Sequence, residues 1–381
     1  MRGAEAVLAC LREQDVDTVF GYPGGMILPL YDALYGQTEI RQILVTHEQN
    51  AAHAADGYAR ATGRVGVCIA TSGPGATNLV TGIATAYMDS IPMVAITGQV
   101  DLEMLGRDAF QETDILDVTM PVTKHNYKVK NAADLVPIIR EAFDLARSGR
   151  PGPVLIDVPR NLFFEEVAYA EQKREERRPG KPDADFAICA AEAAAEIVNA
   201  ERPLVIVGGG VISAGASAQA IAFIEKYKLP VVHTLMGMGG IPSTHPQMLG
   251  FIGMHGAKTA NYAVGAADLV IALGSRFADR QTGNLSKFTA NRKFIHIDID
   301  PAEIDKIVGS SIGLAGDMCV ILNLLMRQAP KSDYAAWWQQ LHTWQEEFAY
   351  DYHSDALSVP WALNQVARMT AGKACAYATD V

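Results

Sequence analysis

Short apolar runs alternate with amphipathic or small-residue segments along most of the chain. Runs such as Val65 to Ala70, Pro92 to Thr97 and Val154 to Pro159 predict buried strands, because they are mostly apolar and are followed by polar, glycine or proline residues. Amphipathic segments between them, such as Val7 to Gln14 and Ala132 to Ser148, predict helices. Strands that alternate with helices form parallel β/α units, so the pattern predicts an α/β protein with parallel sheets.

A charge-rich stretch at residues 166–185 divides this pattern into two series. It includes Lys173 to Arg178, where consecutive charges of mixed sign favour a solvated interdomain linker over a binding patch. We therefore expect a first domain at residues 1–165 and a second at residues 186–330. The second series is a helix and four strands, namely Ala190 to Asn199, then Pro203 to Val207, Leu229 to Thr234, Asp268 to Leu273 and Phe294 to Ile299.

Residues 331–381 predict two more helices and the beginning of another unit. The helices span Asp333 to Ala349, which is rich in tryptophan, and Val359 to Thr370. The residues from Cys375 to Val381 then predict the beginning of a buried strand. A chain that ends inside its next β/α unit is unusual, so we expect a fragment that lacks a third domain. For the tryptophans we expect a structural role.

The junction between a predicted strand and a predicted helix carries the first candidate side chain. The run from Ile40 to Val45 predicts a buried strand, and the segment from Ala51 to Arg60 is rich in alanine, as in a tightly packed helix. Glu48 therefore lies at a strand-to-helix junction, where open α/β sheets bind ligands. On position alone, its carboxylate either stabilises the helix N-terminus or acts as a catalytic acid or base.

Two other strand ends in the first half carry small residues. The segment from Gly21 to Gly25 follows the strand Thr18 to Phe20 and would let a flat ligand come close to the main chain, although an ordinary turn explains it as well. The segment from Thr71 to Asn78 follows the next buried strand and resembles a phosphate-binding loop, but it lacks the lysine of a P-loop. Both loops share their predicted sheet edge with Glu48.

The predicted strands of the second half also end in glycine or hydrogen-bonding residues. Gly208 to Gly210 follows the first strand, as in dinucleotide-binding folds, but Ser213 replaces the last glycine of a full Gly-x-Gly-x-x-Gly pattern. A long dinucleotide lying along the sheet edge needs such strand ends. Arg276 and Arg280 could contact its phosphates, and Asp298 its ribose or base.

Composition excludes several classes of partner. The 381 residues carry a net charge of −11, which argues against nucleic acid or an anionic membrane as the main partner. The five cysteines are far apart and lack metal-binding spacing, which predicts buried free thiols, no metal site and a reducing, cytoplasmic compartment. No apolar run reaches the ~18 residues of a membrane span, and the N-terminus predicts neither a signal peptide nor a transit peptide.

Six short motifs occur in a fixed order along the chain. They are Phe20 to Gly25, His47 to Gln49, Thr71 to Asn78, Phe110 to Glu112, Gly149 to Pro153 and Gly253 to Gly256. Each motif is modest, but the ordered set is specific and covers nearly the whole chain. Together the motifs resemble the thiamine-diphosphate-dependent enzymes, most closely the family of acetolactate (acetohydroxyacid) synthase large catalytic subunits.

The resemblance implies an architecture and a set of partners. Residues 1–165 would form the domain that binds the pyrimidine of thiamine diphosphate, and residues 186–330 a Rossmann-like central domain that holds FAD. A third domain, which binds the diphosphate and Mg²⁺ through a Gly-Asp-Gly motif that is absent here, would begin within residues 331–381. The resemblance also implies a homodimer or homotetramer with active sites at the subunit interface, and a small regulatory subunit as a further partner.

The implied reaction is that of acetolactate synthase, a transferase of branched-chain amino acid biosynthesis. Pyruvate is decarboxylated on thiamine diphosphate, and the hydroxyethyl unit is transferred to a second 2-ketoacid, pyruvate or 2-ketobutyrate. The aminopyrimidine must first reach its imino tautomer, which a carboxylic acid bonded to its ring nitrogen in a dry site favours. By the resemblance Glu48 takes that role and Gln111 faces the reacting carbon. Without the third domain this chain would be inactive alone.

The same resemblance assigns further positions. The substrate channel would be bordered by Phe110, Met254, Arg276 and Arg160. The pyrimidine would be lined by Tyr22, Pro23, Gly24, Thr71, Pro74 and Asn78. FAD would be contacted by Arg150, Gly208, Gly209, Gly210, Thr234, Leu235, Met236, His255, Gly274, Arg276, Arg280, Asp298, Ile299 and Asp317.

Two motifs depart from the family's pattern. Arg160 and Asn161 stand where the family usually has Lys-Asp, and arginine keeps the charge of lysine but not its shape. Ala278 stands where the family has the first Asp of Arg-Phe-Asp-Asp-Arg. Both differences concern substrate or FAD contacts rather than the class of enzyme.

Two other functions remain open. One is a thiamine-dependent carboligase or decarboxylase without FAD, such as a catabolic acetolactate synthase or a sulfoacetaldehyde-type enzyme. The loop from Gly253 to Gly256 and the region of Arg276 argue against that alternative, and flavin content would discriminate the two. The other is an inactive fragment or binding module that holds FAD but not thiamine diphosphate.

Overall fold

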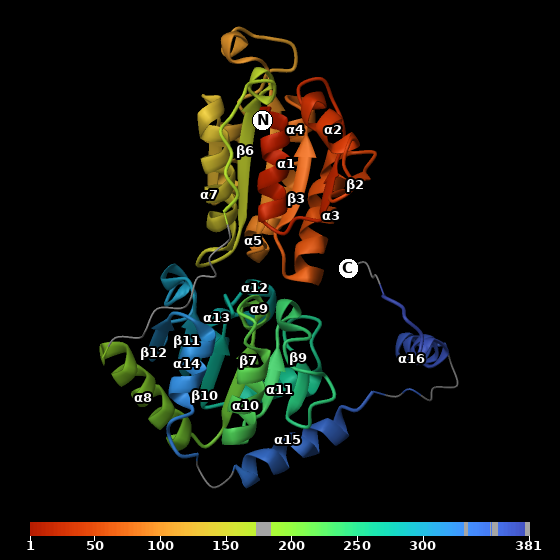
Figure 1. The fold of residues 1–381 in the computed structure, drawn as a ribbon. Coiled ribbons are helices and arrows are strands. Elements are labelled where there is room, and N and C mark those ends of the chain that lie inside the picture. The colour runs from red at the N-terminus through yellow and green to blue at the C-terminus, as the bar shows by residue number, and fades with distance from the viewer. Residues whose placement is uncertain (173–183, 331–333, 351, 353–356, 378–381) are drawn as a thin grey trace. The chain divides into compact units, whose positions relative to one another are not determined.

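The computed structural model describes residues 1–172, 184–330, 334–350, 352 and 357–377. The chain divides into two compact units, Met1–Gly180 and Lys181–Val381, and each unit contains one six-stranded sheet (Figure 1). Parallel pairing within both sheets and helices between the strands confirm the predicted α/β class.

The first unit is built on a parallel sheet with the strand order β2-β1-β3-β4-β6-β5. The chain order reverses at β1, which pairs with β2 on one side and with β3 on the other. In open parallel sheets such a reversal leaves a crevice at the carboxyl ends of the strands, where ligands bind. The strands are β1 Thr18–Gly21, β2 Arg41–Leu44, β3 Gly66–Ala70, β4 Met93–Gln99, β5 His125–Lys128 and β6 Pro153–Pro159.

Helices cover both faces of this sheet (Figure 1). Side chains alternate between the faces, so Val67 and Ile69 of β3 join one core while Cys68 and Ala70 join the other. One face carries α1 Gly3–Glu13, α2 Leu28–Tyr35 and α7 Leu135–Arg147. The other carries α3 Glu48–Thr62, α4 Pro74–Thr77, α5 Val80–Asp89 and α6 Ile115–Thr119.

The core under α3 is built from small side chains. Gly66 of β3 lies so close to α3 that a Cβ atom there would be 2.1 Å from the carbonyl oxygen of Ala55. Gly82 of α5 is equally close, since a Cβ atom there would be 2.4 Å from the Cβ of Ala52. The alanine-rich sequence of α3 therefore reflects close packing, as predicted. The small buried residues are Ala51, Ala52, Ala55, Ala59, Cys68, Ala70, Ala76, Ala86 and Ala95.

The prediction of a buried strand from Ile40 to Val45 is correct for the strand but wrong for its burial. β2 lies at the edge of the sheet, with Arg41 and Leu44 exposed and the side chain of Leu44 64% accessible. Ile40 is the one residue of the run that is buried. An edge strand has a single neighbouring strand, so its apolar side chains are not covered on both faces.

The second unit is built on a parallel sheet with the strand order β12-β11-β10-β7-β8-β9. Numbered from β7, this is the order 6-5-4-1-2-3 of a Rossmann fold, which reverses between β7 and β10. The short strands β9 and β12 escape the sequence prediction. The strands are β7 Pro203–Val207, β8 Val231–His233, β9 Met248–Phe251, β10 Leu269–Leu273, β11 Lys293–Asp298 and β12 Ile312–Ala315.

Most helices of the second unit share one extended core with its sheet, whereas α12 and α16 have no buried residue. α8 and α10 both pack against α14, while α11 packs against α15. The helices are α8 Ala184–Asn199, α9 Gly209–Ser213, α10 Ser217–Tyr227, α11 Lys258–Ala266, α12 Asp279–Thr282, α13 Leu285–Thr289, α14 Met318–Leu325, α15 Ala335–Glu347 and α16 Val359–Thr370.

The tryptophan-rich helix α15 belongs to the core of the second unit. Trp337 is buried and its indole N–H donates to the carbonyl of Pro203 at 3.1 Å. The indole N–H of Trp338 donates to the carbonyl of Lys228 at 3.0 Å, and Tyr334 donates to Ile197 at 2.8 Å. These bonds confirm the structural role expected for Trp337 and Trp338.

Two predicted segments differ from what the structure shows. Residues 166–172, expected to begin a linker, lie against the first unit, where Val167 donates to Met1 at 2.9 Å and Gln172 to Glu13 at 2.8 Å. The charged run from Lys173 to Arg178 lies outside the described residues. The buried strand expected from Cys375 is wrong for residues 375–377, which are exposed and lack regular structure, while residues 378–381 lie outside the described part.

The prediction that all five cysteines are buried is correct for two of them. Cys10 and Cys68 are buried, and burial raises the pKa of each thiol to about 12. Cys189 and Cys319 are half-buried, and Cys375 is exposed. None of the five forms a disulfide.

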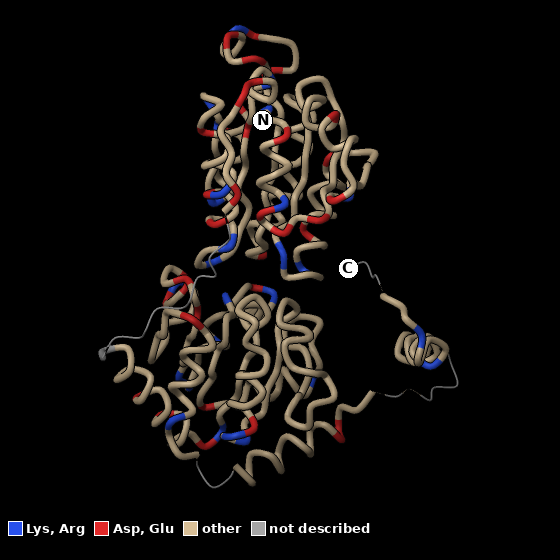
Figure 2. The backbone as a smooth tube through the Cα atoms, in the orientation of Figure 1, with Lys and Arg blue, Asp and Glu red and all other residues tan. Residues whose placement is uncertain are grey.

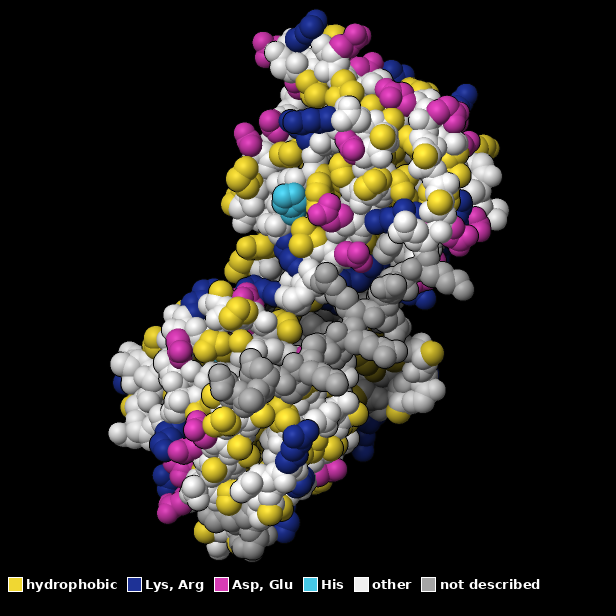
Figure 3. Space-filling model, turned by 60° about the vertical axis from the view of Figure 1, so that its left-hand side comes forward, with side chains coloured by type: hydrophobic (Ala, Val, Ile, Leu, Met, Phe, Trp, Pro, Cys, Tyr) yellow, Lys and Arg dark blue, Asp and Glu magenta, His cyan; other side chains and the backbone are white. Residues whose placement is uncertain are grey.

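Charged residues of both signs are distributed along the backbone of both units (Figure 2). The face in Figure 3 likewise shows hydrophobic side chains interspersed with acidic and basic ones. In the described part of the chain, every helix is too short or too polar to cross a membrane.

The close approach of α5 to α3 predicts opposite effects at two helical glycines. Gly82→Ala should destabilise the first unit by about 1–3 kcal/mol, because the added methyl group overlaps Ala52. Gly57→Ala is the matched control in α3: nothing lies within 4 Å of its added Cβ, so it should stabilise by about 0.5–1 kcal/mol.

Hydrogen exchange of the β3 amides in urea measures these changes. Tryptophan fluorescence does not serve, because all four tryptophans lie in the second unit. Equal effects of the two substitutions would contradict the packing described for α3 and α5.

Candidate active site

The carboxyl ends of the first sheet collect most of the side chains expected to bind the pyrimidine or substrate. Glu48 follows β2, and the segment from Tyr22 to Gly24 follows β1. Thr71 and Pro74 follow β3, and the loop with Gln111 follows β4. Because all these strands are parallel, the loops share one edge of the sheet.

Glu48 is the first residue of α3 and is held there by neighbours from two directions. His47 caps the helix, with its Nδ1 accepting a hydrogen bond from the N–H of Gln49 at 3.1 Å. The side-chain amide of Asn78 donates to Oε2 of Glu48 at 2.9 Å. Glu48 is half-buried. The carboxyl group is therefore oriented by a bond to one oxygen and remains accessible.

Glycines make a close-fitting cradle around this carboxyl group. A Cβ atom on Gly75 would lie 3.3 Å from Oε1 of Glu48 and 2.7 Å from Cγ2 of Thr71. A Cβ atom on Gly24 would lie 2.5 Å from the same Thr71 methyl group. The hydroxyl of Thr71 accepts from the N–H of Met26 at 3.2 Å, which ties the loop after β1 to the loop after β3. Backbone rather than side chains thus lines this part of the edge.

Two buried hydroxyl groups near this cradle have no hydrogen-bond partner among the described residues. They belong to Ser72, next to Thr71, and to Tyr31 of α2. Burial, together with the charges of Cys68 and Glu48, raises the pKa of Tyr31. The sequence analysis missed Tyr31, because its position depends on how α2 packs on the sheet and no local motif marks it.

Gln111 lies on a loop with an unusual backbone. Its φ angle is 56°, in the left-handed region that is unfavourable for residues with a side chain. Its carbonyl oxygen lies so near Gly73 that a Cβ atom there would be only 2.5 Å away. The carboxylate of Glu112 accepts from the N–H groups of Gly106 at 2.5 Å and Ala109 at 3.0 Å. These hydrogen bonds lower the pKa of Glu112.

Phe110 stands beside Gln111 with its side chain 80% exposed. Arg160 follows β6 at the same edge, with its guanidinium 5.5 Å from the ring centre of Phe164. Arg150 lies at the other edge, since it precedes β6, and its Nε donates to the hydroxyl of Ser90 at 2.8 Å. Within the first unit the structure therefore separates Arg150 from the residues around Glu48.

A buried carboxylate that the sequence analysis missed lies between β4 and β6. Asp157 is fully buried and accepts from the hydroxyl of Thr97 at 2.7 Å and from the amide of Gln99 at 3.0 Å. The same amide of Gln99 donates to the carbonyl of Thr113 at 3.0 Å. Burial raises the pKa of Asp157 to about 6, even though these two hydrogen bonds and the charge of Lys128 lower it.

In the second unit the glycines of two strand ends interlock where the strand order reverses. Gly208 and Gly210 follow β7, and Gly274 follows β10. A Cβ atom on Gly208 would lie 2.1 Å from the carbonyl oxygen of Gly274, and one on Gly210 would lie 2.7 Å from its Cα. The N–H of Gly210 donates to Gly274 at 3.1 Å. Only glycine allows this approach, which opens the reversal point to a ligand's phosphates.

The loops after β8 and β9 contribute further expected residues. The hydroxyl of Thr234 accepts from the N–H of Gly237 at 3.1 Å, so it caps the short helix that contains Leu235 and Met236. The loop after β9 exposes Met254 and His255. The N–H of Met254 donates to the carbonyl of Arg280 at 2.9 Å, which joins this loop to the residues after β10.

The charged residues of the second unit that are expected to contact FAD, apart from His255, lie on three neighbouring strand ends. Arg276 is half-buried, while Arg280 is exposed and forms an ion pair with Asp279 at 2.8 Å. Asp298 is buried and accepts from the N–H of Asp300 at 3.0 Å; burial raises its pKa. Ile299 next to it is exposed. The side chain of Asp317 caps α14 by accepting from Val320 at 2.9 Å.

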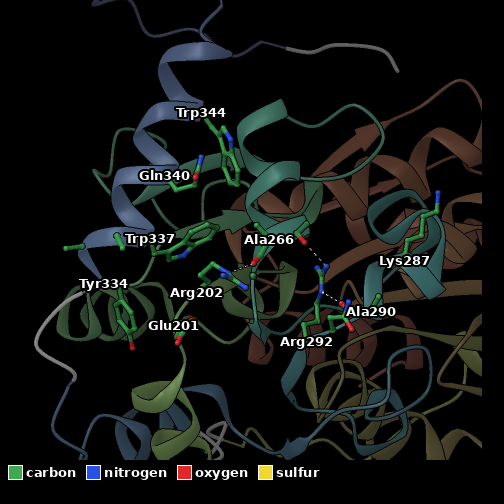
Figure 4. A pocket seen from close by; sticks show the side chains of 15 residues that line it. Glu201, Arg202, Ala266, Lys287, Ala290, Arg292, Tyr334, Trp337, Gln340 and Trp344 are labelled. Carbon is green, nitrogen blue, oxygen red and sulfur yellow. Dashed lines mark hydrogen bonds between the residues drawn. The ribbon is translucent and has the colours of Figure 1, made fainter.

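A pocket of about 950 Å³ lies at the opposite edge of the second sheet, beside α15 (Figure 4). Its walls include Trp337 and two arginines whose guanidinium groups donate to backbone carbonyls. Arg202 donates to Ala266 at 2.8 Å, and Arg292 donates to Gly265 at 2.9 Å. These arginines hold the loops that precede the strands, so the pocket is remote from the expected ligand edge of its sheet. In the described part of the chain, no cluster of three or more acidic, histidine or cysteine side chains could hold a metal ion.

Comparisons with known proteins match both units to one class. Residues 1–118 match the family model "Thiamine pyrophosphate enzyme, N-terminal TPP binding domain", and residues 190–325 match "Thiamine pyrophosphate enzyme, central domain". By fold and by these matches the chain carries the N-terminal and central domains of the thiamine pyrophosphate enzyme family.

Individual relatives narrow this class. The chain is 48% identical over 358 residues to the acetolactate synthase large subunit of Parasynechococcus marenigrum, covering 91% of this chain and 58% of the relative. It is 49% identical over 330 residues to a probable acetolactate synthase large subunit of Methanocaldococcus jannaschii, covering 86% of this chain and 56% of the relative. With the acetolactate synthase isozyme 3 large subunit of Escherichia coli it shares 43% over 386 residues, or 98% of this chain and 67% of that one.

The chain belongs to the family of acetolactate synthase large subunits. This confirms the resemblance read from the six sequence motifs. The chain spans little more than half the length of the first two relatives.

The buried carboxylate predicts a pH dependence of stability. The pKa of Asp157 is about 6 in the folded chain and ordinarily about 3.8, so between these pH values the folded state binds a proton that the unfolded state does not. As the pH falls from 7 to 5, the free energy of unfolding of the first unit should rise relative to that of Asp157→Asn. The slope cannot exceed about 1.4 kcal/mol per pH unit.

Hydrogen exchange of the β3 amides at several pH values measures this difference. Asp17→Asn is the control. The hydrogen bond from Tyr58 lowers the pKa of Asp17, so the titration of Asp17 changes the free energy of unfolding only below about pH 4, outside the range measured. Curves for the unaltered chain and Asp157→Asn that stay parallel from pH 7 to 5 would exclude this linkage.

Proposed function

We propose that this chain supplies the pyrimidine-binding and FAD-binding parts of an acetolactate synthase catalytic subunit. The observation that carries the proposal is the placement of Glu48 at the start of α3, hydrogen-bonded to Asn78 and faced by Gly75. The names and high identities of the relatives support the same reaction. The whole enzyme would decarboxylate pyruvate and transfer the two-carbon unit to pyruvate or 2-ketobutyrate.

The residues around Glu48 fit an aminopyrimidine ring. Positions 24 and 75 present only backbone, and added Cβ atoms would collide with Thr71. A flat ring would lie against this backbone, between the loops after β1 and β3, bordered by Tyr22, Pro23 and Pro74. When bound, thiamine diphosphate supplies an electron sink that makes loss of CO₂ from a 2-ketoacid feasible.

Glu48 would hold and move a proton at the ring. Asn78 occupies Oε2 of Glu48, which leaves Oε1 on the side of Gly75 to meet a ring nitrogen. A carboxyl group fixed in this way exchanges a proton with the ring without reorganising. Gln111 and Phe110, on the adjoining loop, would face the substrate, and Arg160 at the same edge would attract its carboxylate.

The second unit fits a dinucleotide such as FAD. Its Rossmann strand order and the interlocked glycines at positions 208, 210 and 274 leave backbone N–H groups near the reversal point. Arg276 and Arg280 would neutralise phosphates that the net charge of −11 would otherwise repel. Asp298 and Ile299 would border the ribose or the base. Met254 and His255 would lie along the remainder of the ligand, with Met254 also bordering the substrate channel.

The remaining partners of the proposed enzyme are inferred from the family. Mg²⁺ would bind with the diphosphate, outside this chain. We propose a homodimer or homotetramer with active sites between subunits, and a small regulatory subunit. Five cysteines without a disulfide support a reducing, cytoplasmic location.

A thiamine-dependent carboligase without flavin is the second candidate. The small residues around Glu48 would serve it equally well, so the first unit does not discriminate the two. The pairing of Met254 with Arg280 and the interlocked glycines favour the flavin-binding alternative, because both features shape the ligand edge of the second unit.

Titration of the chain with FAD, followed by quenching of flavin fluorescence, tests the second unit. We expect saturable binding, and about tenfold weaker binding for Arg276→Ala, because one charge-assisted contact to a phosphate is lost. Arg327→Ala, an exposed arginine after α14, is the control and should bind normally. A folded chain that does not bind FAD would favour the carboligase without flavin.

The role of Glu48 is tested by acetolactate formation from pyruvate. The chain would be joined to the carboxyl-terminal third of the Escherichia coli isozyme 3 large subunit and supplied with thiamine diphosphate, Mg²⁺ and FAD. Glu48→Gln should lower the rate by about 10²–10⁴-fold, as expected for loss of a general acid or base. Glu39→Gln, at an exposed carboxylate, should leave it unchanged. Equal rates for the two variants would exclude Glu48 as the acid or base.

A further inference from the structure

The loop that carries Gln111 is anchored at both ends by carboxylates. Glu112 closes the loop on itself through the N–H groups of Gly106 and Ala109. Beyond Gln111, the carbonyl of Thr113 accepts from the amide of Gln99, and that amide in turn donates to Asp157. The first anchor is at the surface, and the second reaches into the sheet.

The side chain of Gln99 is held in one orientation in this second anchor. It is buried at the end of β4, and its side-chain oxygen accepts from the N–H of Val100 at 2.9 Å. Its amide nitrogen uses both hydrogens, one on Asp157 and one on Thr113. The orientation of the amide is therefore fixed, and Thr113 is held at a set distance from the buried carboxylate.

A carboxylate at position 157 lowers the stability of the first unit because it is buried. A carboxylate without accessible surface lowers stability unless it accepts hydrogen bonds. Asp157 is fully buried, and among the described side chains Thr97 and Gln99 are the two that donate to it. The charged side chains that act on it are Lys128 of β5 and Asp114 before α6, which themselves form an ion pair at 3.2 Å. A residue that only filled space here would be apolar.

We infer that Asp157 is a positioning residue: through Gln99 and Thr113 it holds the loop that presents Gln111 to the substrate. The strained φ of Gln111 and its contact with Gly73 leave little tolerance, so the backbone keeps this conformation only while both ends are held. The inference rests on the proposed function, which gives Gln111 a substrate to face, but the anchoring itself is a property of the chain without cofactor.

Hydrogen exchange of the 381-residue chain tests the anchor directly. Asp157→Asn and Gln99→Met should speed exchange of the Glu112 and Ile115 amides, which donate to Ala109 and Thr113, about tenfold more than exchange of the β3 amides at the same pH. Thr97→Val should act in the same direction, and Thr97→Ser should restore slow exchange. Thr119→Val is the matched control, since Thr119 is just as buried but bonds only within α6.

The pH profile separates positioning from simple packing. Below about pH 6 protonation of Asp157 removes the charge that strengthens its bond from Gln99, so opening of the loop, corrected for intrinsic exchange, should increase in the unaltered chain. It should not change with pH in Asp157→Asn. Glu112 does not imitate this effect, because its pKa is lowered and it stays ionised.

Two results would overturn the inference. One is exchange of the Glu112 and Ile115 amides that changes no more than exchange of the β3 amides in both Asp157→Asn and Gln99→Met. The other is an equal acceleration in β3 and the loop, which would mean that Asp157 only stabilises the first unit as a whole. If Asp157→Asn does not fold, Gln99→Met and the two Thr97 variants decide the matter. No cofactor is present in these measurements. They therefore test the role of Asp157 even if the chain fails to bind FAD or thiamine diphosphate.

Discussion

The candidate site depends on the close packing of α3 against the first sheet and against α5. Gly66 brings β3 against the carbonyl of Ala55, and Gly82 brings α5 against Ala52. These two approaches fix the height of α3 above the sheet and the position of its first residue, Glu48. Asn78, just before α5, then reaches the carboxyl group at 2.9 Å. Because a close-packed core transmits displacements, a shift of the helix would separate this pair.

The sequence predicts the central strands well and the edge strands β2, β9 and β12 poorly, for one physical reason. Central strands of a parallel sheet are buried on both faces, so they appear as continuous apolar runs such as Val65 to Ala70. β2 is an edge strand whose apolar residues are exposed, and β9 and β12 are short edge strands interrupted by Gly250 and Gly313. Position within the sheet, which pattern alone does not reveal, decides which runs are buried.

The candidate site divides along similar lines. Residues of local motifs, such as Glu48 and the glycines of the loops, are found from sequence because a strand end followed by a helix places them at the ligand edge. Contacts between distant elements are not found in this way. Asp157 meets Gln99 only because β6 pairs with β4, although β5 precedes β6 in the chain. The buried position of Tyr31 likewise depends on the packing of α2.

Both units present glycine backbone at the point where the strand order reverses, but they add side chains of different charge. Each brings glycine backbone against a neighbouring loop, so a ligand meets main chain instead of side chains. The first unit adds a carboxyl group, which suits proton exchange with a ring. The second adds Arg276 and Arg280, which suit phosphates. Arg280 is already paired with Asp279, but this pair is exposed, and such pairs contribute only about 0–1 kcal/mol. A phosphate can therefore displace Asp279 at little cost, and the net negative charge of the chain does not prevent local binding of an anion.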